Sequence, residues 1–385
     1  MKKAWTIDEI KSAMGGAPSR RQLLAGGSAA VAGAFMAPFF PGMARAEVGG
    51  RLKLLAWESM PMQSYLAPFL EANGIDLEIS SIATQDDVHV QLIGNTPNTI
   101  DVTSYSVGYS DFYINELGIV SQMDPKQVPA YNEDDIFAEF YMTPAFAQNG
   151  EVYAVPVIWG LNTLVYNPAL VPEPASYTDL LKPEYAGQLT FIEDTLATWP
   201  MLAKVAGFGD KFPHLTREEL AATFEAAIPY RAQSKLFAGS VGDTINLFVN
   251  GEIGVLFCGW AGIPTETGPQ GVETIAHTPA EGGAMWCDAW FIPKTATNRD
   301  TAHAFINAQL TPEGNAATAN HHLSGCVNRR SVPLLNDEVR ASVDYDNLTQ
   351  VLTDSPLVGM PPRESDEFAT FDEWTAAWED FKLGF

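Results

Sequence analysis

The sequence predicts an α/β protein with two lobes, each built on a central mixed sheet flanked by helices, with a two-strand hinge between them. Strand and helix patterns alternate over residues 52–117, an order typical of an open sheet covered on both faces. A long β-type run over residues 151–166 leads into a second α/β set, and an apolar run over residues 281–293 leads back. Two such crossings imply a hinge with a cleft between the lobes.

The chain has 385 residues, 46% of them hydrophobic, enough for one large or two medium domains. Residues 1–46 form a separate segment, in which a small apolar run follows Ser19-Arg20-Arg21 and an A-x-A cleavage site ends at Ala46. This pattern predicts a twin-arginine export signal cleaved near Ala46 and a periplasmic mature protein. An N-terminal membrane anchor is the alternative, but two prolines interrupt the apolar run.

Acidic residues outnumber basic residues, with 47 Asp and Glu against 22 Lys and Arg. Removal of residues 1–46 takes away six basic and two acidic residues, so the formal net charge moves from −25 to −29. Such a surface repels nucleic acid and anionic lipid and attracts cations, which excludes nucleic acid as a partner. Solubility in a salty habitat is an equally good explanation of the negative charge, because salt screens the long-range attraction of a ligand.

Three cysteines, Cys258, Cys287 and Cys326, stand far apart and show no C-x-x-C pattern of a metal or redox site. In an oxidising compartment this number allows one disulfide and one buried thiol, but the spacing does not choose the pair. Three small buried thiols in the core are the alternative.

The first lobe is predicted to alternate strand and helix. Its strands cover residues 52–57, 76–80 and 100–104, and its helices cover residues 61–73, 84–93 and 106–117. Ligands bind such sheets beyond the carboxyl ends of the strands. Here the first strand ends at Trp57-Glu58-Ser59, and Ser106 follows the third.

The second lobe has predicted strands at residues 188–192, which ends before Asp194, and 253–258, which ends before Trp260. Thr216 forms a capping box with the glutamate three residues later and starts a helix. Further predicted elements are a helix around residues 245–249, a helix beginning near Asn298, a helix with Thr311 as N-cap and Pro312 at its first position, and a Trp-rich helix at residues 372–381.

These elements divide the chain into five predicted parts. They are the export signal (1–46), the first part of lobe 1 (47–157), lobe 2 (158–272), the second part of lobe 1 (273–350) and a C-terminal helical segment that the sequence assigns to neither lobe (351–385). There are no internal repeats and no low-complexity linkers.

The motifs of catalysis are absent: the chain has no G-x-S-x-G, no P-loop, no G-x-G-x-x-G after a strand and no H-E-x-x-H. Adjacent His321 and His322 would point about 100° apart on a helix, so they do not form a metal site. No cofactor is expected. The polar and aromatic groups at the strand ends give the candidate site: Trp57, Glu58, Ser59, Ser106, Asp194, Trp260, Trp286 and Asp288.

Trp286 and Asp288 lie two residues apart in a short apolar run, so in a strand both side chains leave the same face. An indole plane beside a carboxylate suits an organic cation. The alternative is an ordinary buried strand with a core Trp and a turn-capping Asp. The two-lobed arrangement favours the site, because it places this strand next to the cleft.

Several segments together carry a family resemblance. They are Val155-Pro-Val-Ile-Trp-Gly160 with Tyr166-Asn167-Pro168, Tyr177-Thr-Asp-Leu-Leu-Lys-Pro-Glu184, Glu281-Gly-Gly-Ala-Met-Trp-Cys-Asp288 with Ile292-Pro293, Ala302-His-Ala-Phe-Ile-Asn307, and Val327-Asn328. As a set they resemble the type II periplasmic solute-binding proteins of ABC importers, most closely the spermidine/putrescine-binding group, over nearly all of the mature chain. The resemblance implies the two-lobed type II fold. It also implies a monomer that binds a polyamine between aromatic rings and carboxylates and delivers it to an ABC permease in the inner membrane.

Matched by position, Trp57 resembles the family's first-strand tryptophan and Ser106 its serine after the third strand. Trp286 and Asp288 resemble its tryptophan-x-aspartate pair, and Asp194 resembles the first acid of a pair in the second lobe.

Other positions depart from that pattern. The second acid of the pair falls at Ala197, one expected tyrosine falls at Gly108, and another near Ser324 is absent. In the first strand, Glu58 directly follows Trp57, and Ser59 stands where the family has Glu. Trp260 replaces an aromatic residue that the family carries nearer Cys258. A lost carboxylate leaves one ammonium without a partner, which is costly for a buried charge. The ligand is therefore expected to be a shorter, putrescine-like diamine, or another cation such as a quaternary amine or an amino acid.

Three functions other than polyamine capture are conceivable for a two-lobed protein of this kind. Ferric iron is disfavoured, because the adjacent tyrosine pair of iron-binding relatives is missing. A secreted enzyme on the same fold is disfavoured by the lack of a nucleophile, base and orienting group in one constellation. A sensor that presents its ligand to a receptor is compatible with the sequence.

Overall fold

The computed structural model describes residues 48–57, 63–82, 88, 91–92, 99–355, 357 and 359–384. The predicted export signal, the predicted site residues Glu58 and Ser59, and most of the predicted helix at 84–93 lie outside these residues. By its contacts the chain divides into Met1–Ala44 and Arg45–Phe385, and the description below concerns the second unit. Within the described ranges, no helix combines the length and apolar character that a membrane crossing needs.

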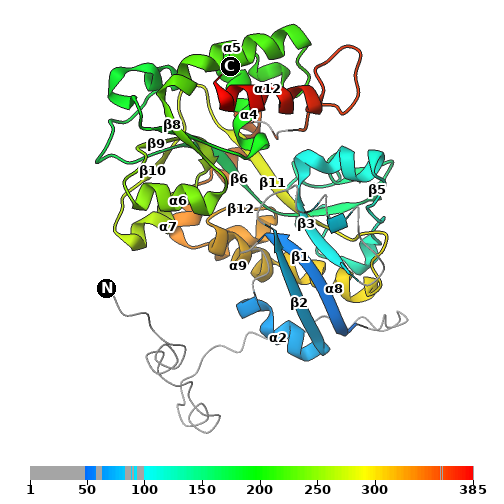
Figure 1. Cartoon of the computed structure of the whole chain (residues 1–385). Coiled ribbons are helices and arrows are strands. Elements are labelled where there is room, and N and C mark those ends of the chain that lie inside the picture. Colours follow the sequence, from blue (N-terminus) through cyan, green and yellow to red (C-terminus); the bar gives the residue numbers. More distant parts are fainter. Residues whose placement is uncertain are drawn as a thin grey trace, which may run out of the picture. The chain divides into compact units, whose positions relative to one another are not determined.

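A ten-stranded mixed sheet organises the described part of the chain (Figure 1). Its path is β2-β1-β3-β11-β6-β9-β7-β8, with β10 and β12 also paired to β6. The bounds are β1 Gly50–Trp57, β2 Ile75–Ile82, β3 Val102–Ser106, β6 Ala154–Tyr166, β7 Leu189–Ile192, β8 Ser234–Ala238, β9 Val255–Trp260, β10 Ile275–His277, β11 Ala284–Phe291 and β12 Gly325–Cys326. A small separate sheet pairs β4 Ala147–Gln148 with β5 Glu151–Val152.

The strands β6 and β11 connect two parallel sets. β1 pairs in parallel with β2 and β3, and β7 pairs in parallel with β8 and β9. β11 runs antiparallel to both β3 and β6, and β6 runs antiparallel to β9. In Figure 1 these two strands lie between the blue strands of the first set and the green strands of the second. The apolar runs at residues 151–166 and 281–293 therefore become the link between the sets.

Helices cover the sheet. They are α2 Gln63–Asn73, α4 Thr195–Val205, α5 Arg217–Gln233, α6 Val241–Val249, α7 Ile263–Thr267, α8 Arg299–Leu310, α9 Pro312–His322, α10 Asp337–Ala341, α11 Leu348–Asp354 and α12 Phe371–Leu383. The predicted capping box of α5 is confirmed, because Thr216 and Glu219 exchange side-chain to backbone hydrogen bonds. The predicted start of α9 is also confirmed, with Thr311 accepting from the Gly314 N–H and Pro312 at the first position.

The predicted helix over residues 106–117 is wrong as a continuous α-helix. A 3-10 turn forms at Val107–Tyr109 and a π-helical turn at Phe112–Glu116. Between them, the Ser110 hydroxyl donates to backbone carbonyl oxygens at Val107 and Ala145. Such side-chain bonds compete with the helical ladder, and the aromatic rings of this stretch are held by packing across to β11.

The hydrophobic core is divided. One cluster joins β1, β2, β3, α8 and α9, and a second joins β7, β9, α4, α5 and α12. The C-terminal segment, which the sequence assigned to neither lobe, packs in the second cluster: Trp374 stacks on Trp199 with ring centroids 5.2 Å apart. Cys258, Cys287 and Cys326 are free and buried, so the three-thiol alternative holds and no disulfide forms.

Candidate functional site

Trp286 and Asp288 lie on β11, in the strand that the sequence predicted for them. Both are half-buried, whereas Met285, Cys287 and Ala289 between and beside them are buried. This alternation places the indole and the carboxyl group on one face of the sheet.

Gly160 on β6 makes room for the indole of Trp286. The two residues are directly opposite in the antiparallel pair. A Cβ atom at Gly160 would lie 2.6 Å from Cζ2 and 2.9 Å from Cε2 of Trp286, so the ring lies on the glycine backbone. The glycine in the Val-Ile-Trp-Gly segment is thus required by the tryptophan of a strand more than a hundred residues away.

Two residues of the first sheet set adjoin Asp288. Ser106, the last residue of β3, is directly opposite Asp288 in the β3–β11 pair. Trp57, the last residue of β1, has a buried indole N–H without a hydrogen-bond partner. This N–H does not reach hydrogen-bond geometry, yet it lies near enough to the Asp288 carboxyl group to lower the pKa of Asp288.

Asp194 belongs to the second sheet set. It follows β7 and caps α4, accepting from the backbone N–H groups of Leu196 at 3.1 Å and Ala197 at 3.2 Å. Its side chain is exposed to solvent, yet desolvation by the surrounding protein raises its pKa, and the two capping bonds only partly oppose that shift.

The two carboxyl groups are close enough to interact. The pKa of Asp288 is raised to about 7, first by burial and then by the negative charge of Asp194, and the Trp57 indole opposes both. Neither acid forms an ion pair with a basic residue in the described part of the chain. The pair therefore concentrates negative charge that a bound cation would neutralise.

Trp260, at the end of β9, lies over Gly262, where a Cβ atom would be 2.2 Å from its ring. It is directly opposite Asn162 on β6, and Asn162 is in turn opposite Ala284 on β11. Asn162 is not among the site residues predicted from the sequence. The signal was an amide in the largely apolar run of β6, two residues after Gly160 and therefore on the same face.

The structure thus groups Trp57, Ser106, Asp194, Trp286 and Asp288, and it connects Trp260 to them through β6. Where the sequence departs from the family pattern, Ala197 is buried in α4 and the Ser324 hydroxyl donates to the His322 carbonyl oxygen. No cluster of three or more potential metal ligands occurs among the described residues.

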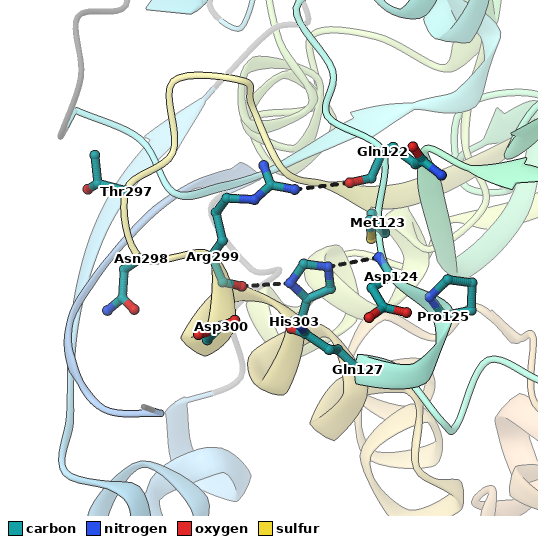
Figure 2. A pocket seen from close by; sticks show the side chains of 10 residues that line it. All are labelled: Gln122, Met123, Asp124, Pro125, Gln127, Thr297, Asn298, Arg299, Asp300 and His303. Atoms are coloured by element: carbon teal, nitrogen blue, oxygen red, sulfur yellow. Dashed lines mark hydrogen bonds between the residues drawn. The ribbon is translucent and has the colours of Figure 1, made fainter. Parts of the chain in front are cut away.

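A pocket of about 780 Å³ lies elsewhere, between the loop at residues 122–127 and the start of α8 (Figure 2). Its polar groups hold the loop to the helix. Arg299 donates to the Gln122 carbonyl oxygen at 3.0 Å, and His303 accepts from the Asp124 N–H at 3.2 Å and bonds the Arg299 carbonyl oxygen at 2.7 Å. Burial lowers the pKa of His303, so the ring is neutral in this position. None of the predicted site residues lines this pocket.

The cap formed by Asp194 gives a testable prediction. Asp194→Ala should lower the free energy of unfolding by about 1 kcal/mol, because α4 loses its N-cap. Asp194→Asn should stay close to the native protein, since asparagine caps equally well. Both variants should lower the pKa of Asp288 by removing a repelling charge. Chemical denaturation and carboxyl NMR titration measure the two effects, and an Ala variant as stable as the Asn variant would contradict the capping role.

Comparison with known proteins gives relatives over most of the chain. This chain is 25% identical over 261 residues to the spermidine/putrescine-binding periplasmic protein of Salmonella typhimurium, and the alignment covers 67% of this chain and 72% of that protein. It is 24% identical over 330 residues to a putrescine-binding periplasmic protein of Escherichia coli, covering 81% of this chain and 87% of that protein.

Solved structures share the fold. A spermidine/putrescine ABC transporter substrate-binding protein from Streptococcus pneumoniae superposes with a TM-score of 0.70 at 18% identity, covering 87% of this chain and 99% of that chain. A periplasmic binding protein from A. tumefaciens R10 in complex with agropinic acid has a TM-score of 0.62 at 16% identity, covering 87% and 96%. These likenesses confirm the predicted α/β fold of the type II periplasmic binding proteins.

Residues 64–345 match the family that is described as "bacterial extracellular solute-binding protein". This match spans well over half of the chain and agrees with the relatives above. The chain belongs to the bacterial extracellular solute-binding protein family.

Proposed function

We propose that the protein captures a small organic cation, with a putrescine-like polyamine as the first candidate, and delivers it to a membrane permease. Its membership of the family makes it the solute-binding component of an ABC importer and not an enzyme. The observation that carries the cation assignment is the pair Asp194 and Asp288, which interact electrostatically and have no basic partner among the described residues. Asp288 also lies beside the indole of Trp57. Carboxylates and indoles together stabilise an ammonium group.

The arrangement of the sheet supports a cleft as the place of capture. β6 and β11 link the two parallel strand sets, and the same two strands carry Gly160, Trp286 and Asp288. We assign lobe 1 to residues 47–157 and 273–350 and lobe 2 to residues 158–272, with the solute between them. The C-terminal helix adds to the second lobe through its packing on α4 and α5.

The identity of the cation has one alternative. The relatives named for spermidine and putrescine are distant, and a structural neighbour is in complex with agropinic acid. Ala197 occupies the place of the second acid, so one ammonium of a long polyamine would lack a carboxylate there. A quaternary amine or an amino acid is therefore the second candidate. Export by the twin-arginine route and action as a periplasmic monomer complete the proposal.

Ligand-induced stabilisation tests this function directly. The mature chain is screened by thermal shift and calorimetry against putrescine, spermidine, cadaverine, betaines and amino acids. A true solute at ~100 times its dissociation constant should stabilise the protein by roughly 2.7 kcal/mol, because it binds only the folded state. A shift with a betaine or amino acid and none with a polyamine would transfer the assignment to that solute, and no shift with any cation would refute it.

A further inference from the structure

Asn162 is a largely buried residue whose side-chain amide forms no hydrogen bond within the described chain. It is 8% exposed and lies inside β6, where its flanking residues are largely apolar. Its amide atoms are not among the buried polar atoms that lack a partner, so the small exposed part of this residue includes the amide group, where a ligand can reach it.

Other buried asparagines of the chain have structural partners. The Asn315 amide donates to the Val157 carbonyl oxygen at 2.6 Å and accepts from two backbone N–H groups. Asn328 donates to the Leu310 carbonyl oxygen at 2.9 Å and accepts from the Arg330 N–H. These side chains hold loops to helices and strands. Asn162 does nothing comparable, so its place in β6 is not explained by the fold.

The register of the sheet puts Asn162 on the face of the candidate site. Gly160, two residues earlier on β6, carries the Trp286 indole on its backbone. Trp260 on β9 is directly opposite Asn162. Residues directly opposite in an antiparallel pair and residues two apart on a strand share a face. The amide therefore lies between the positions of the two indoles, on the side that carries Asp288.

We infer that Asn162 contacts the solute and determines its specificity, by hydrogen bonding a polar group other than the ammonium held at Asp194 and Asp288. This inference rests on the proposed function. A carboxamide both donates and accepts but adds no charge. It suits an uncharged hydroxyl, amide or carbonyl group better than a second ammonium, which requires a carboxylate. The solute class that fits has one cationic end and one uncharged hydrogen-bonding end.

Four amines that share a four-carbon chain separate the contribution of the ammonium group from that of the polar end, in calorimetry on the mature protein. Butylamine has the ammonium alone, 4-aminobutanol and N-acetylputrescine add an uncharged polar end, and putrescine adds a second ammonium. The native protein should bind the two polar-ended monocations more tightly than butylamine. Asn162→Leu should weaken them about tenfold, the loss of one hydrogen bond to a buried partner, and leave butylamine within twofold.

Asn162→Asp provides the second variant, because it keeps the size and shape of the side chain. It should raise the affinity for putrescine relative to butylamine, since a carboxylate then meets the second ammonium. Gln127→Leu is the matched control: Gln127 has a buried amide oxygen without a hydrogen bond, but it lies in the pocket of Figure 2, away from β6. It should change no affinity.

The outcomes distinguish this inference from the function on which it rests. A native protein that binds none of the amines would refute the proposed function and the inference together. A native protein that binds them, combined with an Asn162→Leu variant that loses nothing or loses butylamine equally, would refute the role of Asn162 alone. An Asn162→Asp variant with unchanged preference between putrescine and butylamine would also contradict it.

Discussion

Asp288→Asn should weaken binding of the cation by about 1.5–3 kcal/mol, roughly 10- to 150-fold, through the loss of a charge-assisted hydrogen bond. The variant should not unfold. Burial and the charge of Asp194 raise the pKa of Asp288, so ionised Asp288 is unfavourable in the empty site. Asparagine removes that cost, and the empty variant should be at least as stable as the native protein at neutral pH. Calorimetry and chemical denaturation measure the two effects.

The same residue predicts how affinity depends on pH. Below its pKa of about 7, Asp288 holds a proton that a bound cation must displace. Affinity should therefore fall about tenfold for each pH unit below 7 and level off above it. In the empty protein the raised pKa has the opposite consequence: its contribution to stability is complete below the unfolded pKa near ~4 and is lost as the pH rises towards 7. The Asn variant should lose the part of each dependence that Asp288 contributes, and keep only that of Asp194.

A remote acid provides the control for net charge. Asp124 caps a short turn beside the pocket of Figure 2, and asparagine can take over that cap. Asp124→Asn changes the net charge by the same unit and should leave affinity and its pH profile unchanged. If it weakened binding as much as Asp288→Asn does, long-range attraction and not a direct contact would explain the effect. Unchanged affinity in Asp288→Asn would remove this residue from the site.

Gly160→Ala should displace the Trp286 indole and weaken binding. The new methyl group would lie 2.6 Å from the ring, so the ring must move off the β6 backbone. Loss of a cation–π contact in a desolvated site costs about 1–2 kcal/mol, and the clash should lower the free energy of unfolding by about 1–3 kcal/mol. Calorimetry and chemical denaturation detect both losses.

Two further variants test whether the clash with the Trp286 indole causes these losses. Gly268→Ala adds a methyl group where no atom lies within 4 Å and where φ is −55°, so it should change neither binding nor stability appreciably. Combining Gly160→Ala with Trp286→Phe replaces the indole by a smaller ring, and the stability losses should then be less than additive. Native affinity in Gly160→Ala would show that the position of the indole does not matter for the solute.

The parts of the fold that the sequence predicted well depend on local chemistry. Thr216 with Glu219, and Thr311 with Pro312, start helices through contacts within one turn, so their signals are complete in the sequence. The helix prediction for residues 107–116 was wrong for the opposite reason. Its conformation depends on Ser110 reaching the carbonyl oxygen of Ala145 and on aromatic packing against β11, neither of which is local.

The sequence by itself determined that Trp286 and Asp288 share a face, because side chains alternate in any strand. It also indicated the family through segments spread along the chain. Only the tertiary structure decided that Asp194 lies close enough to raise the pKa of Asp288, that Gly160 makes room for Trp286, and that Asn162 joins their face. These relations depend on the register between strands far apart in sequence. Alternation along one strand carries no information about that register, which is fixed only when the whole sheet assembles.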